Sequence, residues 1–444
     1  MRLQRELFMN KMKQSRVEWI GVIPEKWELR RWKNILKERK EKNDPIVTDF
    51  ILSLSIEQGV FPYSEKKGGG NKAKDDLSAY KVARPNDIVI NSMNILAGAV
   101  GLSSWLGAVS PVYYTFYSDN DCANIDYYYY LFQTKEFQKS LMGLGNGILI
   151  KESSNGKLNT IRMRIPSEKL NCLLLPIPPI SEQQQIAKFL DEKTALIDDI
   201  ITDTKQTIEE LKSYKQSLIS EIVTKGINKN GKLVPSGIEW IGEVPEEWEV
   251  LKSRYFLNEI SVKGYPDEEV LSLYRDYGII PKNSRSDNHN VTSSDTSGYK
   301  LVKPGNLVIN KMKAWQGSMA ISNLRGIVSP AYYTFEVDNE RFNLRFLHYA
   351  LRNPAYKQEY MRISAGLRVG QWDLNKNEFK NLKYAFPANK EEQKAIADYL
   401  DEKISQIDTL ITEKENVISE YENYKKSMIY EYVTGKKRVE GYES

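Results

Sequence analysis

SEQQQIAKFLDEKTALIDDIITDTKQTIEELKSYKQSLISEIVTK occupies residues 181–225 and contains neither glycine nor proline. The run ends at Gly226, the residue type that most often terminates a helix. Apolar side chains recur along it with the heptad spacing of a coiled coil, although the pattern is imperfect. The segment therefore predicts one long helix with an apolar seam, about 67 Å in length at 1.5 Å per residue.

A second segment repeats this pattern 210 residues later and ends at Gly435. Each apolar stripe alone would face water, so we expect the two helices to pack against each other as an antiparallel pair within the chain. An ordinary oligomerising coiled coil explains the seam equally well. The expected seam consists of Ile186, Leu190, Ile197, Ile200, Leu211 and Leu218, and of Ile396, Leu400, Ile407, Leu410, Val417, Tyr421 and Met428.

The repeat extends outward from the helices over most of the chain. EWIGVIPEKWE from Glu18 recurs as EWIGEVPEEWE from Glu239, and VSPVYYTF recurs as VSPAYYTF 219 residues later. Internal repeats of this length indicate a duplicated architecture. The expected divisions are an N-terminal arm (1–17), a first globular domain (18–180), the central helix (181–226), a linker (227–238), a second globular domain (239–389), the distal helix (390–435) and a tail (436–444).

Each globular domain is expected to mix helices and strands. YKVARPNDIVINSM and GYKLVKPGNLVINKM predict a turn followed by a strand, and VSPAYYTF predicts another strand. YYYYLFQTKEFQKSLM and FNLRFLHYALRNPAYKQEYM have helical spacing. The fold class is therefore α+β, with two mixed α/β domains joined by two antiparallel coiled-coil helices in a pseudo-twofold repeat. The tryptophans of the WIGxxPxxW motifs are expected to pack each domain against its helix.

Charge is divided between the helices and the rest of the chain. The 444 residues carry a net charge of +4, but residues 181–225 carry −3 and residues 390–434 carry −5, which leaves +12 elsewhere. Phosphate would be attracted to the basic domains and repelled by the acidic helices. DNA is therefore expected to contact the domains. The alternating segments that differ between the copies, 63–79 and 282–298, are polar and are expected to be recognition loops; drift of surface loops is the alternative explanation.

Several functional classes are disfavoured by the sequence. Cys122 and Cys172 form no CxxC pair, and with His289 and His348 they cannot build a conventional zinc site. No Walker A motif, S-adenosylmethionine loop or methyltransferase catalytic tetrad occurs. We therefore expect no catalytic residues, no metal site and no cofactor in this chain. The sequence has no signal-peptide pattern and no stretch long enough to span a bilayer, so a cytoplasmic location is expected.

The combination of the doubled EWIGxxPxxWE motif, an SxG segment near the end of each domain, and PPISEQQQIAKFLDEK before a long helix resembles the specificity subunit (HsdS) of type I restriction-modification enzymes. The resemblance covers nearly the whole chain. It implies two target recognition domains that read a split DNA site, and helices that set the spacing and bind two methyltransferase subunits. Restriction subunits would join in some systems, and S-adenosylmethionine, ATP and Mg would be bound by the partners.

Candidate DNA contacts follow from the loops and from the SxG segments, because Arg and Lys suit guanine and phosphate whereas Asn and Gln suit adenine. In the first domain they are Lys66, Lys67, Asn71, Lys72, Lys74, Ser154, Asn155, Lys157 and Asn159. In the second domain they are Lys282, Asn283, Arg285, Asn288, His289, Lys311, Lys313, Gln316, Arg368 and Gln371. Because the inserts differ, we expect a split, asymmetric target. The rival hypothesis is a coiled-coil scaffold with duplicated protein-binding domains and no DNA role.

Overall fold

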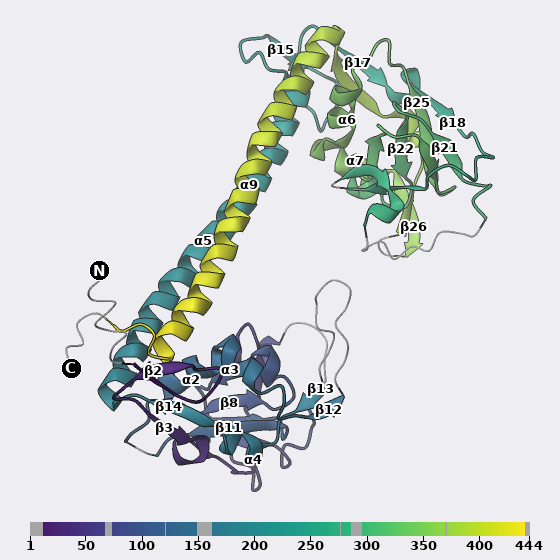
Figure 1. Ribbon diagram of the computed structural model, residues 1–444. Coiled ribbons are helices and arrows are strands. Elements are labelled where there is room, and N and C mark those ends of the chain that lie inside the picture. Colours follow the sequence, from purple (N-terminus) through teal and green to yellow (C-terminus); the bar gives the residue numbers. More distant parts are fainter. Residues whose placement is uncertain are drawn as a thin grey trace. The chain divides into compact units, whose positions relative to one another are not determined.

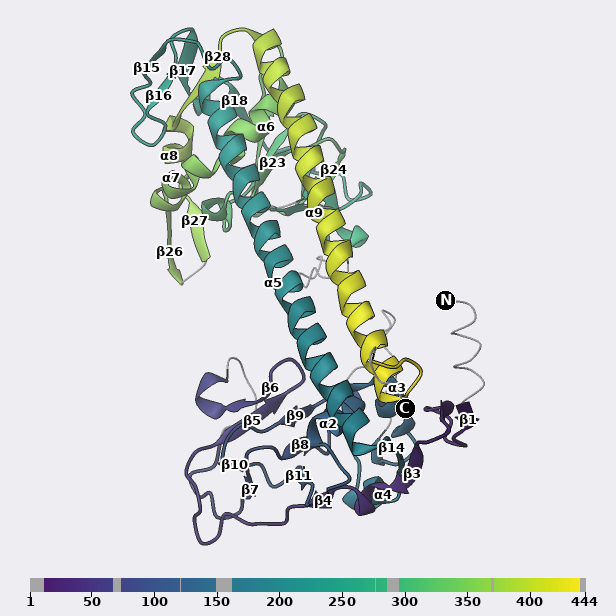
Figure 2. The ribbon, with the colours of Figure 1, turned by 90° about the vertical axis from the view of Figure 1, so that its left-hand side faces the viewer.

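The computed structural model describes residues 12–66, 73–119, 121–148, 162–275, 277–285, 295–368 and 371–439. It divides into two compact units, Met1–Asp203 with Asn416–Ser444, and Thr204–Glu415. Each unit combines one globular α+β domain with part of both long helices, α5 (Ile180–Lys225) and α9 (Lys390–Val433), which lie side by side in both views (Figures 1 and 2). Within these ranges, no helix has the length and apolar character needed to cross a membrane.

The first unit is built around an antiparallel sheet with strand order β4-β11-β8-β9. The remaining strands form antiparallel pairs, β1–β2, β3–β14, β5–β6, β7–β10 and β12–β13. The strands are β1 (Met12–Gln14), β2 (Val22–Pro24), β3 (Glu28–Arg31), β4 (Lys37–Glu38), β5 (Leu52–Ser55), β6 (Gly59–Pro62), β7 (Lys81–Ala83), β8 (Ile88–Asn91), β9 (Val100–Leu102), β10 (Gly107–Val109), β11 (Tyr113–Tyr117), β12 (Asn146–Ile148), β13 (Arg162–Arg164) and β14 (Leu174–Ile177). The helices are η1 (Trp32–Asn34), η2 (Tyr63–Glu65), η3 (Ile95–Ala97), α2 (Ile125–Gln133), α3 (Lys135–Ser140) and α4 (Ser167–Asn171).

The second unit repeats this topology, with the sheet order β18-β25-β22-β23 and the pairs β15–β16, β17–β28, β19–β20, β21–β24 and β26–β27. Its strands are β15 (Leu233–Pro235), β16 (Glu243–Pro245), β17 (Trp248–Lys252), β18 (Leu257–Ile260), β19 (Leu271–Tyr274), β20 (Gly278–Pro281), β21 (Lys300–Val302), β22 (Leu307–Asn310), β23 (Met319–Ile321), β24 (Gly326–Val328), β25 (Tyr332–Val337), β26 (Ser364–Arg368), β27 (Gln371–Leu374) and β28 (Lys383–Pro387). The helices are η4 (Ser253–Tyr255), η5 (Lys282–Ser284), η6 (Ala314–Gln316), α6 (Leu344–Arg352), η7 (Pro354–Tyr356), α7 (Lys357–Arg362) and α8 (Lys376–Asn381).

The sequence predictions for the domain elements are confirmed. The two Pro-Asn and Pro-Gly turns precede β8 and β22, and the two YYTF segments form β11 and β25 beside those strands. The helical segments form α2 and α3 in the first unit and α6 to α7 in the second. Asn124 and Asn343 cap α2 and α6 through their side-chain oxygens, which explains why both helices begin there.

Within each unit the two long helices run antiparallel, as expected. In the first unit Lys425 pairs with Asp198 at 2.6 Å, and in the second Lys215 pairs with Asp408 at 2.7 Å. The repeat offset of 210 residues relates the two aspartates to each other and the two lysines to each other, so the same interhelical ion pair is formed once in each unit. The internal duplication is thus preserved in the contacts between the helices.

The heptad phase of the seam differs in part from the expected one. Leu190, Ile197, Leu218, Leu400, Ile407 and Met428 are buried, and Ile186 and Ile396 are buried where the helices meet the domains. Leu410 and Val417 are 46% and 38% exposed, so their assignment to the seam was wrong. Ile200, Leu211 and Tyr421 are half-buried. Ile201, Ile208 and Ile222, which the sequence predicts to widen the apolar stripe, are all buried.

In each unit, a tryptophan of the domain donates a hydrogen bond to a glutamate at the start of a long helix. The Trp27 indole donates to Glu182 at 2.9 Å, and the Trp248 indole donates to Glu392 at 3.0 Å, which confirms the expected role for the second tryptophan of each motif. The next residue, Gln183, accepts a hydrogen bond from the Asn124 amide at the start of α2. Gln393 does the same with the Asn343 amide at the start of α6. The Glu-Gln pair therefore fixes each domain on its helix.

Gly435 has a specific steric role after the end of α9. Its φ of +71° lies in the left-handed region, and a Cβ at this position would lie 2.5 Å from the Cδ of Pro24. Nearby, the Tyr127 hydroxyl donates to the Val433 carbonyl at 2.7 Å. The turn after α9 therefore packs against the strand that precedes Trp27, and only glycine fits there.

Candidate nucleic-acid interface

The second unit brings two of the predicted contact groups together. The turn after β22 carries Lys311 and Lys313 and continues into η6, and the β26–β27 hairpin lies against it, since the Leu374 amide donates to the Lys311 carbonyl at 2.9 Å. The Lys311 ammonium pairs with Asp373 at 2.8 Å. The ring centroids of Trp315 and Trp372 are 5.1 Å apart across the same junction. The turn and the hairpin thus form one surface, which we call the second reading edge (residues 311–316, 364–368 and 371–374).

The first unit builds the same junction from different residues. The Ile165 amide donates to the Ser92 carbonyl at 3.0 Å, at positions equivalent to Leu374 and Lys311. The Ser92 hydroxyl donates to the Val112 carbonyl at 2.7 Å, and no tryptophan pair is available at the equivalent positions, Leu96 and Met163. The backbone frame of this first reading edge (residues 92–97, 146–148 and 162–165) is therefore shared, whereas its side chains differ.

A second feature of the second unit places an arginine over two aromatic rings. Arg285 follows η5, and its guanidinium carbon lies 4.5 Å from the Tyr277 ring centroid and 5.6 Å from that of Tyr274. The two rings are themselves in edge contact at 6.5 Å. Tyr277 is 62% exposed, so the cluster faces solvent. Such cation–π contacts restrict the arginine side chain without neutralising its charge.

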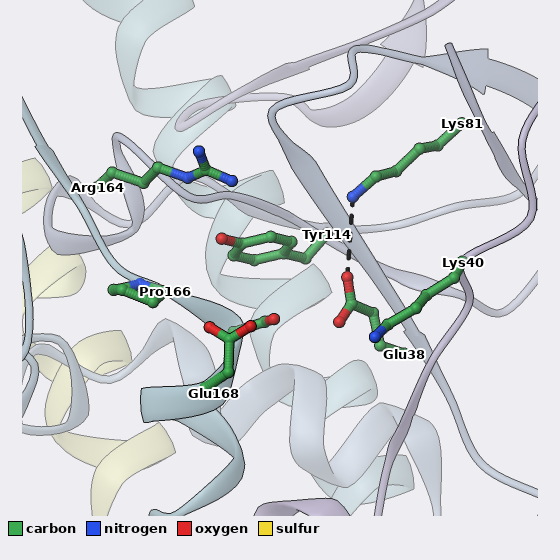
Figure 3. A pocket seen from close by; sticks show the side chains of 8 residues that line it. Glu38, Lys40, Lys81, Tyr114, Arg164, Pro166 and Glu168 are labelled. Atoms are coloured by element: carbon green, nitrogen blue, oxygen red, sulfur yellow. Dashed lines mark ion pairs between the residues drawn. The ribbon is translucent and has the colours of Figure 1, made fainter. Parts of the chain in front are cut away.

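The first unit also contains a polar pocket beside β4, β11 and α4 (Figure 3). Its volume is about 380 Å³, and its lining includes Lys40, Lys81, Arg164, Glu38 and Glu168. In Figure 3 the Arg164 and Lys81 head groups lie on one side of the Tyr114 ring and Glu168 on the other. We call this the β4–α4 pocket.

Lys81 is the innermost cation of the β4–α4 pocket. Its ammonium donates to the Tyr113 carbonyl at 2.8 Å and lies 3.8 Å from Glu38. Burial lowers the pKa of Lys81, Glu38 opposes this effect, and the positive charges of Arg164 and Lys40 lower the pKa further. Positive charge is therefore concentrated around a partly desolvated lysine.

The second unit has a lysine at the equivalent position with a similar environment. Lys300 donates to the Tyr332 carbonyl at 2.6 Å. Burial lowers its pKa, Glu259 opposes this effect, and Lys263, Lys376 and Lys311 lower the pKa further. We refer to these cations with Lys300 as the Lys300 cluster.

Glu259, the acidic neighbour of the Lys300 cluster, is more completely paired than Glu38 in the first unit. Although burial alone would raise the pKa of Glu259, hydrogen bonds from Lys376 and Lys380 lower it. Their ammonium groups lie 2.6 and 3.0 Å from its carboxylate oxygens. Because Ser167 and Asn171 stand at the equivalent positions of α4, Glu38 receives no such pairs from that helix.

The predicted contact residues fall into three groups. Lys66, Lys74, Lys282, Asn283, Arg285, Lys311, Lys313 and Gln316 lie in the described loops and turns, where Lys313 and Lys74 are exposed and Lys66 lies over the Tyr63 ring. The backbone places Arg368 at the end of β26 and Gln371 at the start of β27. The remaining candidates lie outside the described residues, namely Lys67, Asn71, Lys72, Ser154, Asn155, Lys157, Asn159, Asn288 and His289.

The structure adds residues that are not among the predicted contacts. Lys81 and Lys300 could have been found, since both follow a tyrosine in a block that recurs at an offset of 219 residues. Trp315 and Trp372 gave no signal, because they have no counterparts in the first copy and lie 57 residues apart in sequence. In the described ranges, no three or more His, Cys, Asp or Glu side chains are arranged to hold a metal ion.

These features define a duplicated adaptor, in which two equivalent domains present different side chains from a common frame. A family model described as the type I restriction modification DNA specificity domain matches residues 24–210 and 245–420. The chain belongs to this family, and it is a non-catalytic specificity subunit of a type I restriction-modification system, with two target recognition domains.

Individual relatives match along nearly the whole length of the chain. It is 26% identical over 438 residues to the type I restriction enzyme MjaVIII specificity subunit of Methanocaldococcus jannaschii, which covers 94% of each chain. In fold it is similar to the HsdS subunit from Thermoanaerobacter tengcongensis, with a TM-score of 0.52, 14% identity and coverage of 94% and 98% of the two chains. A chain from a study of complex assembly and conformational transition of the type I R-M system gives a TM-score of 0.65, 13% identity and coverage of 94% and 99%.

Proposed function

We propose that this chain reads a split, asymmetric target in double-stranded DNA, with one half-site read by each domain, and that it directs methyltransferase subunits to that target. The observation that carries the proposal is the pair of reading edges. Their backbone frames are equivalent, but Lys311 and Asp373 of the second edge correspond to Ser92 and Arg164 of the first. Different donors and acceptors on one frame suit different base sequences, because base edges in the major groove present distinct hydrogen-bond patterns.

The orientation of each reading edge depends on the rest of its domain. The Trp-Glu and Gln contacts fix each domain on the start of a long helix, and these contacts are repeated in both units. Fixed attachment of each domain to its helix supports the reading of a base sequence, because base contacts require accurate placement of a few side chains. The exposed cations beside the edges would hold phosphates and the edges would then contact bases.

The helices are the proposed docking sites for two methyltransferase subunits and, in systems that include one, for a restriction subunit. Their outer positions carry large exposed apolar side chains, Leu196, Val417 and Tyr424 in the first unit and Tyr214 and Leu410 in the second. Exposed apolar side chains on an otherwise acidic helix favour a protein partner over DNA. In this arrangement S-adenosylmethionine, and ATP with Mg, are bound by the partner subunits, and the complex acts on DNA in the cytoplasm.

The proposal is tested by reconstituting the chain with its methyltransferase subunits and titrating duplex DNA at several salt concentrations. Binding that weakens steeply with salt, and methylation of a two-part sequence, are the expected results. Salt-independent assembly without DNA binding would instead support the coiled-coil scaffold. A short palindromic target would contradict the assignment of one half-site to each domain.

A further inference from the structure

We propose that Lys81 with the rim of the β4–α4 pocket, and Lys300 with its cluster, are two equivalent binding sites for backbone phosphates of DNA, one beside each half-site. This inference rests on the proposed function and adds to it a pair of sites that hold the duplex irrespective of sequence.

The two domains share an inner lysine with similar surroundings. Lys81 and Lys300 keep the same residue type, the same hydrogen bond to a tyrosine carbonyl and the same acidic neighbour. The side chains of the two reading edges differ. A feature that is the same in both domains cannot distinguish two different half-sites, and the component that both half-sites share is the sugar–phosphate backbone.

The first site has open space beside the Lys81 ammonium group. An ammonium group has three donors, and Lys81 directs one to the Tyr113 carbonyl at 2.8 Å. Its distance of 3.8 Å to Glu38 is too long for a hydrogen bond. The pocket of about 380 Å³ next to it is large enough for a phosphate group, and the exposed side chains of Lys40 and Arg164 stand at its rim.

The charge balance of the first site favours an anion. Lys40, Lys81 and Arg164 carry three positive charges against two negative charges on Glu38 and Glu168. Burial lowers the pKa of Lys81, Glu38 opposes this effect, and Arg164 and Lys40 lower the pKa further, so a bound phosphate would stabilise the charged ammonium group. Arg164 also presents a planar fork of donors that matches phosphate oxygens.

The second site reaches a similar balance with other residues. The positive charges of Lys263, Lys311 and Lys376 act on Lys300 against the negative charge of Glu259, which is paired with Lys376 and Lys380. Even with the Asp373 carboxylate that pairs with Lys311, the excess of positive charge is larger here. The identity of the surrounding cations differs between the domains while the inner lysine does not, which is the pattern expected of a site that recognises charge and not sequence.

The experiment uses the complex reconstituted with its methyltransferase subunits, and fluorescence anisotropy against a duplex that contains the methylated sequence and against a scrambled duplex. The variants are Lys81→Gln, Lys300→Gln and the rim variant Lys40→Gln, and Arg164 is kept because it also belongs to the first reading edge. The Lys40 side chain is exposed, so its replacement tests the first site even if Lys81→Gln fails to fold. Lys26→Gln is the matched control, because Lys26 is exposed, lies in the first unit and does not line the pocket.

Each single lysine variant is expected to weaken binding of both duplexes by the same factor, about threefold to tenfold, and to reduce the slope of log affinity against log salt by about 1. The methylated sequence should stay unchanged, and the control should match the wild type. Two results would overturn the inference and leave the proposed function intact. One is wild-type affinity and salt slope in the rim and lysine variants, and the other is a loss of affinity confined to one base sequence. Failure of the wild-type complex to bind DNA would instead overturn the proposed function.

Discussion

Replacing Trp372 with alanine should impair recognition of one half-site only. Trp372 lies in β27, and its ring centroid is 5.1 Å from that of Trp315 in η6. A two-stranded hairpin is marginally stable by itself, so the β26–β27 hairpin depends on its contacts with the turn after β22. The Lys311–Asp373 pair is partly exposed and contributes little. Leu374 at the end of β27 is buried in the domain core, and the indole pair is the aromatic contact between the hairpin and η6.

The magnitude follows from the half-buried position of the ring. An aromatic pair contributes about 0.5 to 1.5 kcal/mol beyond the burial of its area, and loss of a fully buried tryptophan costs about 3 to 5 kcal/mol. A half-buried indole should therefore stabilise the hairpin by roughly 1 to 3 kcal/mol. This corresponds to a loss of roughly 5-fold to 150-fold in affinity for the second half-site.

The assay compares duplexes mutated in either half-site, together with amide hydrogen exchange of the hairpin and of β28. Faster exchange is expected in residues 364–368 and 371–374, with β28 unchanged. Trp372→Phe should restore most of the affinity because it keeps a ring against Trp315. Trp105→Ala is the control, since this 38% exposed indole belongs to the first domain. Equal losses at both half-sites, or no loss with faster exchange, would refute the reasoning.

Three further outcomes are expected. Arg368→Ala should change recognition only in the half-site read by the second domain, and methylation assays on half-site mutants would contradict this if both halves lose equally. Deleting one heptad from each long helix, residues 201–207 and 411–417, shortens each helix by about 10.5 Å. The spacer between the half-sites should then shorten by about three base pairs, with both half-sites unaltered. If methylome sequencing finds an unchanged spacer, the helices do not set the spacer length. Burial raises the pKa of Glu182 above its ordinary value near 4.5, so the charged carboxylate reduces stability as pH rises through that folded-state pKa. Glu182→Gln should therefore unfold at pH 7 at no lower denaturant concentration than the wild type, and it should flatten this pH dependence. Glu182→Ala leaves the Trp27 indole unpaired and should lower the free energy of unfolding by about 1 to 3 kcal/mol. Equal losses of stability in the two variants would contradict this.

Most of the architecture could be predicted from the sequence because the two copies of the internal repeat can be compared with each other. The offset of 210 residues identified both long helices, and the offset of 219 residues identified equivalent strands in both domains. These features depend on local patterns, namely apolar periodicity, the absence of proline, and turn residues before β-branched runs.

The heptad phase was harder to predict. Ile200 and Leu410 recur at the same seven-residue interval as the buried series, yet they lie on the flank or outside of the seam. Periodicity alone cannot decide which of two neighbouring stripes is covered, because burial also depends on the domain that packs against the helix and on partners that cover the outer face. Val417 belongs to such an outer stripe.

The candidate sites were only partly predictable for a related reason. Polar loops rich in Lys and Asn are visible in the sequence, but the junction of Lys311 with Asp373 and the pocket around Lys81 arise from residues far apart in the chain. The sequence selected Lys311 and not Lys81, since a lysine beside a strand is most often an exposed residue. Its burial and its cationic neighbours are properties of the tertiary structure.

Methylated bases can be sequenced in genomic DNA from a host that expresses this chain with its methyltransferase subunits. If each domain reads one half-site, the result is one non-palindromic motif of two different short half-sites separated by a spacer of fixed length, and only one half-site is lost when one domain is exchanged for that of a relative. A single short palindrome, or methylation that does not depend on this chain, would contradict this assignment of one half-site to each domain.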